Sequence, residues 1–128
     1  MGRNKKYNLS EVTEKMKKVF VEKGYEATSI DDLVDVTELL RGSLYSQFGS
    51  KLKMFSAVLD SSLKMNEKDM DLDIILIALM ELCPRNNKLR LKISNWYKDF
   101  LPAKIDNLLI NRILARAKLK DEVNNIEK

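Results

Sequence analysis

Apolar residues recur at helical spacing along almost the whole chain, and no segment alternates apolar and polar residues as a strand would. Near the N-terminus, Val12, Met16 and Phe20 share one face of a predicted helix. A capping residue, Asn8, precedes this helix, and Gly24 is its stop signal. Because glycine and proline are scarce elsewhere, few signals interrupt the helical pattern. The pattern predicts an all-α fold.

Three more helices are predicted next, at about 30–37, 40–48 and 51–68. Ser29 caps the first of them, and Asp32 stands at the third helical position, as a capping box requires. The helix at 40–48 follows a tight turn. This order is that of a helix-turn-helix, whose second helix lies in the DNA major groove.

The acid-rich stretch 66–73 is the predicted boundary between two units. The first unit, 6–66, is a three-helix head containing the helix-turn-helix at about 29–48. The second, 67–128, is a short C-terminal helical bundle. The acids at the boundary suit the start of the next helix, where the helix dipole favours negative charge.

The second unit contains three predicted helices. The helix at 72–83 is apolar nearly all round, so it is expected to be buried on every side. The next starts after Asn86 or Asn87, and the last spans about 103–122 with an apolar stripe wider than one packing face needs. This excess of apolar surface predicts an isologous homodimer. Its interface would be formed by the last helix, by the fifth helix at 72–83, or by both.

Composition limits the chemistry that is expected. The net charge of +4 permits nucleic-acid binding without arguing for it. With no histidine, no glycine-rich phosphate loop and a single cysteine, we expect no enzyme, cofactor, metal site or internal disulfide. That residue, Cys83, is either structural or, with Arg85 nearby, a redox sensor. Without a signal-peptide pattern or a membrane-length apolar run, the sequence favours a soluble cytoplasmic protein that makes no membrane contact.

Residues 7–60 resemble the TetR/AcrR family of bacterial repressors. The matching positions are Phe20, the segment EKGYEATS at 22–29, Asp32-Leu33, RGSLY at 41–45, FGSK at 48–51 and Phe55. The resemblance implies a homodimer whose third helices each enter the major groove of one half of a palindromic operator. It also implies a C-terminal domain that pairs the subunits and encloses an inducer pocket.

The candidate DNA contacts follow from the side chains that this motif presents. Hydroxyl or basic groups suited to phosphate are Ser29, Ser43, Tyr45 and Lys51. Arg41 and Gln47 suit base edges, and Ser46 shares their helix. A basic arm along the backbone or minor groove is formed by Arg3, Lys5 and Lys6. The alternative interpretation is a solvated polar face on a small helix.

Two positions depart from the family's pattern. Glu38 stands where a turn glycine is common, and Leu40 stands where a polar cap is common. Each departure costs about 1 kcal/mol. The turn is therefore either reshaped, or the two helices merge their ends differently. Asp31 and Asp35 add negative charge near the DNA side.

Met and aromatic residues between positions 65 and 100 offer a lining for a small apolar inducer, with ordinary core packing as the favoured alternative. They are Met65, Met70, Met80, Trp96, Tyr97 and Phe100. The sequence thus predicts a repressor acting as a homodimer on double-stranded DNA. The alternative is a shortened paralogue that binds DNA weakly and heterodimerises with, or antagonises, a full-length regulator.

Overall fold

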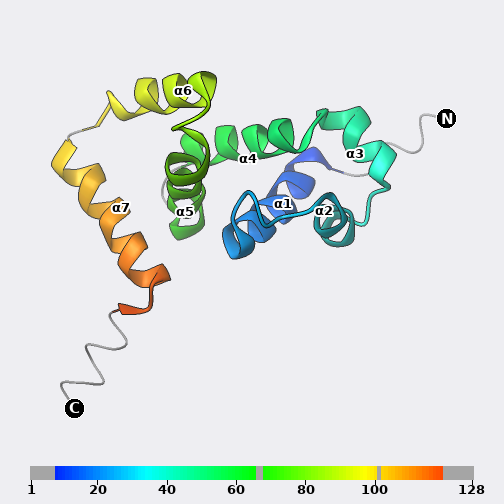
Figure 1. Cartoon of the computed structure of the whole chain (residues 1–128), viewed down its shortest axis with the longest axis horizontal. Helices are drawn as coiled ribbons and strands as arrows, with labels where there is room; N and C mark the ends of the chain where they lie inside the picture. Colours follow the sequence, from blue (N-terminus) through cyan, green and yellow to red (C-terminus); the bar gives the residue numbers. More distant parts are fainter. Residues whose placement is uncertain (1–7, 66–67, 101, 120–128) are drawn as a thin grey trace, which may run out of the picture.

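The computed structural model describes residues 8–65, 68–100 and 102–119, and every regular element within them is helical, which confirms the all-α prediction. The elements are α1 (Leu9–Lys23), α2 (Ile30–Thr37), α3 (Arg41–Phe48), α4 (Lys51–Met65), α5 (Asp69–Ile77), the π-helical turn η2 (Ala78–Leu82), α6 (Asn87–Tyr97) and α7 (Pro102–Arg116). In Figure 1, α3 lies at one end of α4 and α5–α7 lie at the other, while α1 and α2 lie below α4 and α3.

Helix α1 starts and stops where the sequence predicts. The Asn8 side chain accepts hydrogen bonds from the N–H groups of Ser10 and Glu11, at 2.8 and 3.3 Å. At the other end, Gly24 has φ +86°, a conformation that glycine adopts without strain. A Cβ at Gly24 would also stand 2.7 Å from Oε2 of Glu81. Glycine is therefore favoured here by conformation, and a larger residue would also displace the Glu81 carboxylate.

The Glu81 carboxylate ties η2 to the loop after α1. Its Oε1 accepts from the N–H of Glu26 at 2.9 Å, and its Oε2 accepts from that of Tyr25 at 3.3 Å. These two N–H groups precede α2 and have no strand or helix partner. The second half of the chain therefore contacts the head at the loop that leads into the helix-turn-helix.

One hydrophobic core runs through both halves of the chain. In the head, the Phe55 ring meets the rings of Phe20 and Tyr25 edge-on, with centroids 5.1 and 5.4 Å apart. The same cluster of buried residues continues to Ile75 and Ile93 in the second half. The division at 66–67 stays a prediction, because the packing itself is continuous.

The turn between α2 and α3 keeps its ordinary shape in spite of Glu38 and Leu40. Ser29 and Asp32 form the predicted capping box. Glu38 takes the left-handed conformation itself, with φ 63° and ψ 21°. Leu40 occupies the N-cap position without a side-chain hydrogen bond, so α3 begins one residue later than predicted, at Arg41. The predicted reshaping of the turn is wrong, because Glu38 tolerates the backbone that glycine would favour.

Glu38→Gly is expected to raise the free energy of unfolding by about 0.5–1 kcal/mol, because it removes a side chain from a left-handed position. Asp35→Gly is the matched control, since it places glycine inside α2 and should destabilise by a similar amount. Urea unfolding measures both. A Glu38→Gly variant less stable than the wild type would contradict the strain argument.

Part of the acid-rich stretch at 66–73 is buried rather than exposed to solvent. Helix α4 is described as far as Met65, and α5 begins at Asp69 rather than Leu72. Asp71 and Asp73 are buried, with exposed fractions of 1% and 3%. Their partners are distant in sequence, so a local interpretation of the charge pattern missed them.

Each buried aspartate has a cationic partner from another helix. Lys17 of α1 donates to Asp71 at 2.7 Å. Arg112 of α7 donates to both oxygens of Asp73, at 2.9 and 3.1 Å, and this pairing raises the pKa of the Arg112 guanidinium. Arg116 lies 3.5 Å from the same carboxylate. These pairs fix α5 between α1 and α7.

The C-terminal helices differ from expectation at their ends. The apolar side chains of α5 are buried within the single chain, as predicted, but Met80 in η2 is 69% exposed. Asn86 caps α6 by accepting from the N–H of Leu89 at 3.0 Å. Helix α7 ends at Arg116 and not near Glu122, since Lys118 adopts φ 59°. No helix within the described ranges has the length and apolar character needed to cross a membrane.

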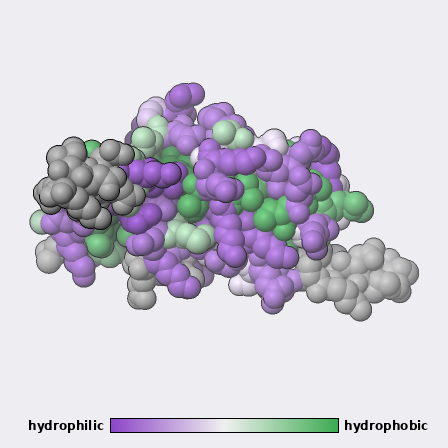
Figure 2. Space-filling model, turned by 90° about the horizontal axis from the view of Figure 1, so that it is seen from below, coloured by the Kyte–Doolittle hydropathy of each residue, from purple (hydrophilic) through white to green (hydrophobic). Residues whose placement is uncertain are grey.

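Helix α7 carries an apolar surface that its own chain does not cover. Ile105 is 2% exposed, whereas Ile110 and Ile113 are 52% and 40% exposed. Leu108 is also exposed, on the other side of the packed face. The surface seen in Figure 2 is mainly hydrophilic, with hydrophobic areas between the polar side chains. The uncovered apolar surface that the sequence predicts therefore lies on α7. The apolar side chains of α5 are already covered within the single chain.

Candidate nucleic-acid interface

Helix α3 is anchored on one side and exposed on the other. Leu44 is fully buried and Phe48 packs against the core, which fixes the rotation of the helix. The side chains on the exposed side are Arg41, Tyr45, Ser46 and Gln47, with Ser43 half-buried beside them. The structure thus brings all five predicted residues of this helix to one broad surface at the end of the molecule opposite α7 (Figure 1). An eight-residue helix presented in this way fits the width of a major groove.

Arg41 is engaged by an acid of the preceding helix. Its guanidinium donates to Oδ1 of Asp31, and both side chains are largely exposed. Asp31 and Asp35 leave the α2 side of this surface acidic, as expected from the sequence. An exposed pair of this kind is weak, so a base or phosphate can replace Asp31 as the partner of Arg41.

Lys51 is turned inward, which the sequence did not indicate. Its Nζ donates to the backbone oxygens of Thr28 and Tyr25, at 2.9 and 3.1 Å. It also lies 4.4 Å from the centre of the Tyr25 ring. Two of its three N–H donors thus hold the loop before α2. The lysine positions the head, and a phosphate can share only the remaining donor.

Ser29 serves first as a cap. Its hydroxyl oxygen accepts from the N–H of Asp32 at 3.0 Å, and Asp32 accepts from the N–H of Ser29 at 2.9 Å. The bond from the Ser29 N–H, followed by the one from Lys23, lowers the pKa of Asp32. The Ser29 hydroxyl proton is still able to reach a phosphate, because the cap uses only the oxygen.

Leu40 is a surface residue that the sequence argument treated only as a missing cap. Its side chain is 76% exposed at the start of α3. An apolar side chain in this place can contact a thymine methyl group. The signal in the sequence was the unusual leucine at a cap position. The predicted arm, Arg3, Lys5 and Lys6, lies outside the described residues.

The second half contains an apolar cavity of about 380 Å³ between η2, α6 and α7. Its lining residues are Leu79, Cys83, Arg90, Ile93, Ser94, Trp96, Tyr97, Asp106 and Leu109. Of the predicted inducer contacts, Trp96 and Tyr97 are here. Met80 lies instead beside another cavity, near Ile113, and Phe100 packs on the Trp96 ring with centroids 4.8 Å apart. This cavity is thus lined by two of the four predicted residues, and the inducer contacts stay a prediction.

The pKa values of two side chains that line this cavity, Tyr97 and Cys83, are raised. Tyr97 donates a hydrogen bond to Asp106 at 2.8 Å, and this bond raises the pKa of Tyr97. Burial raises the pKa of the Cys83 thiol, against a smaller opposing effect of Arg90. The neutral thiol is therefore favoured, which supports the structural alternative for Cys83 over the redox sensor.

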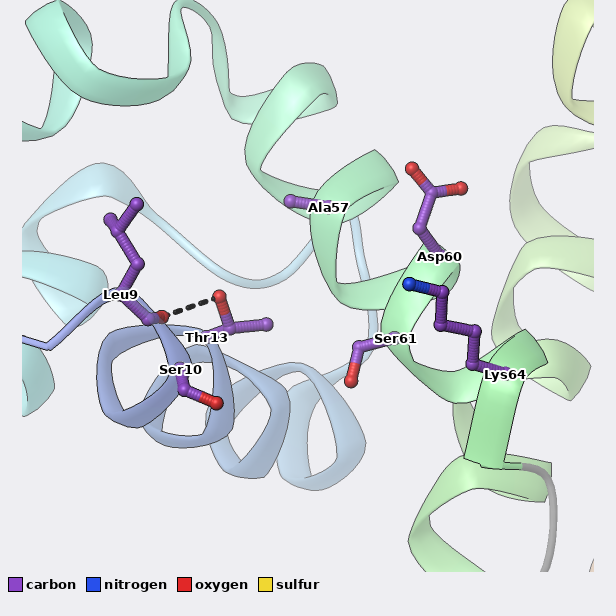
Figure 3. A pocket seen from close by; sticks show the side chains of 7 residues that line it. All are labelled: Leu9, Ser10, Thr13, Ala57, Asp60, Ser61 and Lys64. Carbon is purple, nitrogen blue, oxygen red and sulfur yellow. Dashed lines mark hydrogen bonds between the residues drawn. The ribbon is translucent and has the colours of Figure 1, made fainter.

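A second cavity of about 380 Å³ separates the start of α1 from α4 (Figure 3). Its hydroxyl groups come from Ser10, Thr13 and Ser61, and Asp60 and Lys64 lie at its far side. The Thr13 hydroxyl donates to the backbone oxygen of Leu9 at 2.8 Å, which is ordinary bonding within a helix. These groups do not converge on one point, so the groove gives no specific binding chemistry.

The capped α2, the left-handed turn and the outward-facing α3 define a helix-turn-helix protein. Residues 14–58, about a third of the chain, match the family model for bacterial regulatory proteins of the tetR family. The match covers α2, α3 and most of α1 and α4, which is the part of the chain built around the exposed surface of α3.

Curated relatives match about half of the chain. An uncharacterised HTH-type transcriptional regulator, YezE of Bacillus subtilis, is 39% identical over 64 residues, covering 50% of this chain and 33% of the relative. The HTH-type transcriptional repressor ComR of Escherichia coli is 42% identical over 59 residues, covering 46% and 28%. The match thus spans about a third of the length of these relatives. No solved structure matches the chain.

Proposed function

We propose that this protein is a sequence-specific DNA-binding transcriptional regulator that acts as a repressor. The observation that carries the proposal is the exposed surface of α3, held by Leu44 and the capped turn, within a region that matches the tetR family. A relative of this region is named a transcriptional repressor, which favours repression over activation. Residues 6–66 are the proposed DNA-reading unit, and 67–128 the proposed pairing and effector unit.

The proposed contacts divide by chemistry. Arg41 and Gln47 read base edges, and Leu40 adds an apolar contact. Tyr45 and Ser43 donate hydroxyl protons to phosphate oxygens, which fix the position of the helix on the duplex. Ser29 contributes from the start of α2, where backbone N–H groups also favour phosphate.

The proposed operator is palindromic because the proposed assembly is a homodimer. The exposed apolar side chains of α7 support an interface on this helix, at the end of the molecule opposite α3 (Figure 1). A two-fold symmetric pair places its two α3 helices on two half-sites. The cavity at Trp96 and Tyr97 adjoins α7, so a small apolar inducer bound there could alter the pairing of the subunits.

The pairing of Arg41 with Asp31 favours a second candidate. An acid beside a base-reading arginine weakens attraction to phosphate, as expected of a protein that binds DNA poorly. In that case the protein pairs with a full-length regulator through α7 and antagonises it.

Tyr45→Ala tests the DNA-reading surface. The variant should lose binding to the DNA upstream of its own gene, and its circular dichroism and thermal unfolding should stay unchanged, because the Tyr45 side chain is 43% exposed. Tyr45→Phe isolates the hydroxyl, and Glu22→Ala on exposed α1 surface is the matched control. Unchanged affinity of Tyr45→Ala would remove α3 from the interface.

A further inference from the structure

The largest cavity described here lies between α4 and α6, and the proposed function does not use it. Its volume is about 440 Å³, within the range of sites for small organic molecules. Its lining comes from the first turns of α4 and from the start of α6: Leu52, Lys53, Ser56, Asn86, Lys88, Leu89 and Lys92. The cavity at Trp96 shares none of these residues.

The lining is cationic. It contains three lysines and no carboxylate. Lys92 is neutralised from outside the lining, since its Nζ lies 2.7 Å from Oδ1 of Asp60, and it also donates to Ser56 at 3.1 Å. Lys53 and Lys88 form no ion pair with any carboxylate in the described ranges. Two lysines of the lining therefore have no carboxylate partner among the described residues.

The floor of the cavity is apolar. Leu89 is 4% exposed and belongs to the core cluster, and Leu52 packs against the same cluster. Between the lysines, the Ser56 hydroxyl and the Asn86 amide are the polar groups of the lining. A molecule complementary to this lining has one anionic group for the lysines and a short apolar body for the leucines.

We propose that this cavity binds a small anionic amphiphile, a molecule with one carboxylate or phosphate group and an apolar body. Lys92 of α6 donates hydrogen bonds to Asp60 and Ser56 of α4, which already connect these two helices. A bound anion at Lys53 and Lys88 adds a second bridge between the two helices. Because α4 follows the recognition helix directly, the bridge links this site to the head.

Calorimetric titration of the full chain tests the proposal and does not depend on DNA binding. The probes are octanoate, octyl phosphate, octylamine and inorganic phosphate. Octanoate or octyl phosphate should bind saturably with one site per chain, and the stronger of the two identifies the anionic group. Octylamine should show no binding, because the lysines repel it.

Variants assign the binding to this cavity. Lys53→Gln/Lys88→Gln should weaken the binding of the preferred probe by about tenfold or more, since each charge-assisted contact is worth more than 1 kcal/mol. Lys98→Gln, an exposed lysine at the other end of α6, should leave binding unchanged. The proposal is overturned if neither anionic amphiphile binds, if the double variant binds as the wild type does, or if inorganic phosphate binds as tightly as octyl phosphate.

Discussion

Lys17→Met is expected to lower the free energy of unfolding by about 3–5 kcal/mol, because it leaves a buried carboxylate without its counter-charge. The side chains of Lys17 and Asp71 are 3% and 2% exposed, and the two charged atoms lie 2.7 Å apart. Oδ2 of Asp71 is buried without a hydrogen-bond partner among the described residues, so this carboxylate depends on Lys17. The loss is a large part of the stability of a small domain.

A double variant separates the ion pair from general packing damage. Lys17→Met/Asp71→Leu should recover most of the lost stability, since replacing a whole buried pair by apolar residues is often neutral. Lys18→Met, on the exposed face of α1, is the matched control and should change stability by less than about 0.5 kcal/mol. Denaturant unfolding measures the free energy of unfolding of the wild type and of the three variants. A loss below 1 kcal/mol for Lys17→Met would contradict the account of this pair.

Ile110→Lys is expected to weaken subunit association by about 100-fold or more, because it places an unpaired charge in an apolar interface. Ile110 is 52% exposed on α7, and its helical neighbour Ile113 is exposed as well. Asn111→Lys adds the same charge at an exposed polar position of the same helix and should have a much smaller effect. Sedimentation velocity over a range of micromolar concentrations measures association.

The dimer proposal has two ways to fail in this experiment. A wild-type protein that sediments as a monomer at micromolar concentration would contradict pairing altogether. A dimer that is unchanged by Ile110→Lys would place the interface elsewhere than this face of α7. In either case the folded state of each variant is checked by circular dichroism.

Local signals in the sequence were enough to place most helix ends. Asn8, Ser29 and Asn86 each cap the helix that follows, because a cap depends on residues two or three positions apart. The left-handed turn at Glu38 was not predicted, because a side chain disfavours this conformation and the sequence therefore indicated a reshaped turn or merged helix ends. The outward face of α3 followed from helical period alone.

Contacts between distant segments were not predictable in the same way. The burial of Asp71 was not predicted, because its partner, Lys17, is 54 residues away. Lys51 was expected to point to phosphate, but the loop carbonyls that it binds are more than 20 residues earlier in the chain. The Glu81 contact with the head likewise depends on how η2 is placed against α1. Tertiary packing, rather than local pattern, decides these side chains.

The central claim is that the surface of α3 reads a specific DNA sequence. The most direct measurement is a titration of the purified protein against its own upstream DNA and against random DNA of equal length, at several salt concentrations. We expect nanomolar-range affinity for the upstream DNA alone, with both affinities falling as salt rises because phosphate contacts release counterions. Equal, salt-sensitive affinity for the two DNAs would contradict the claim.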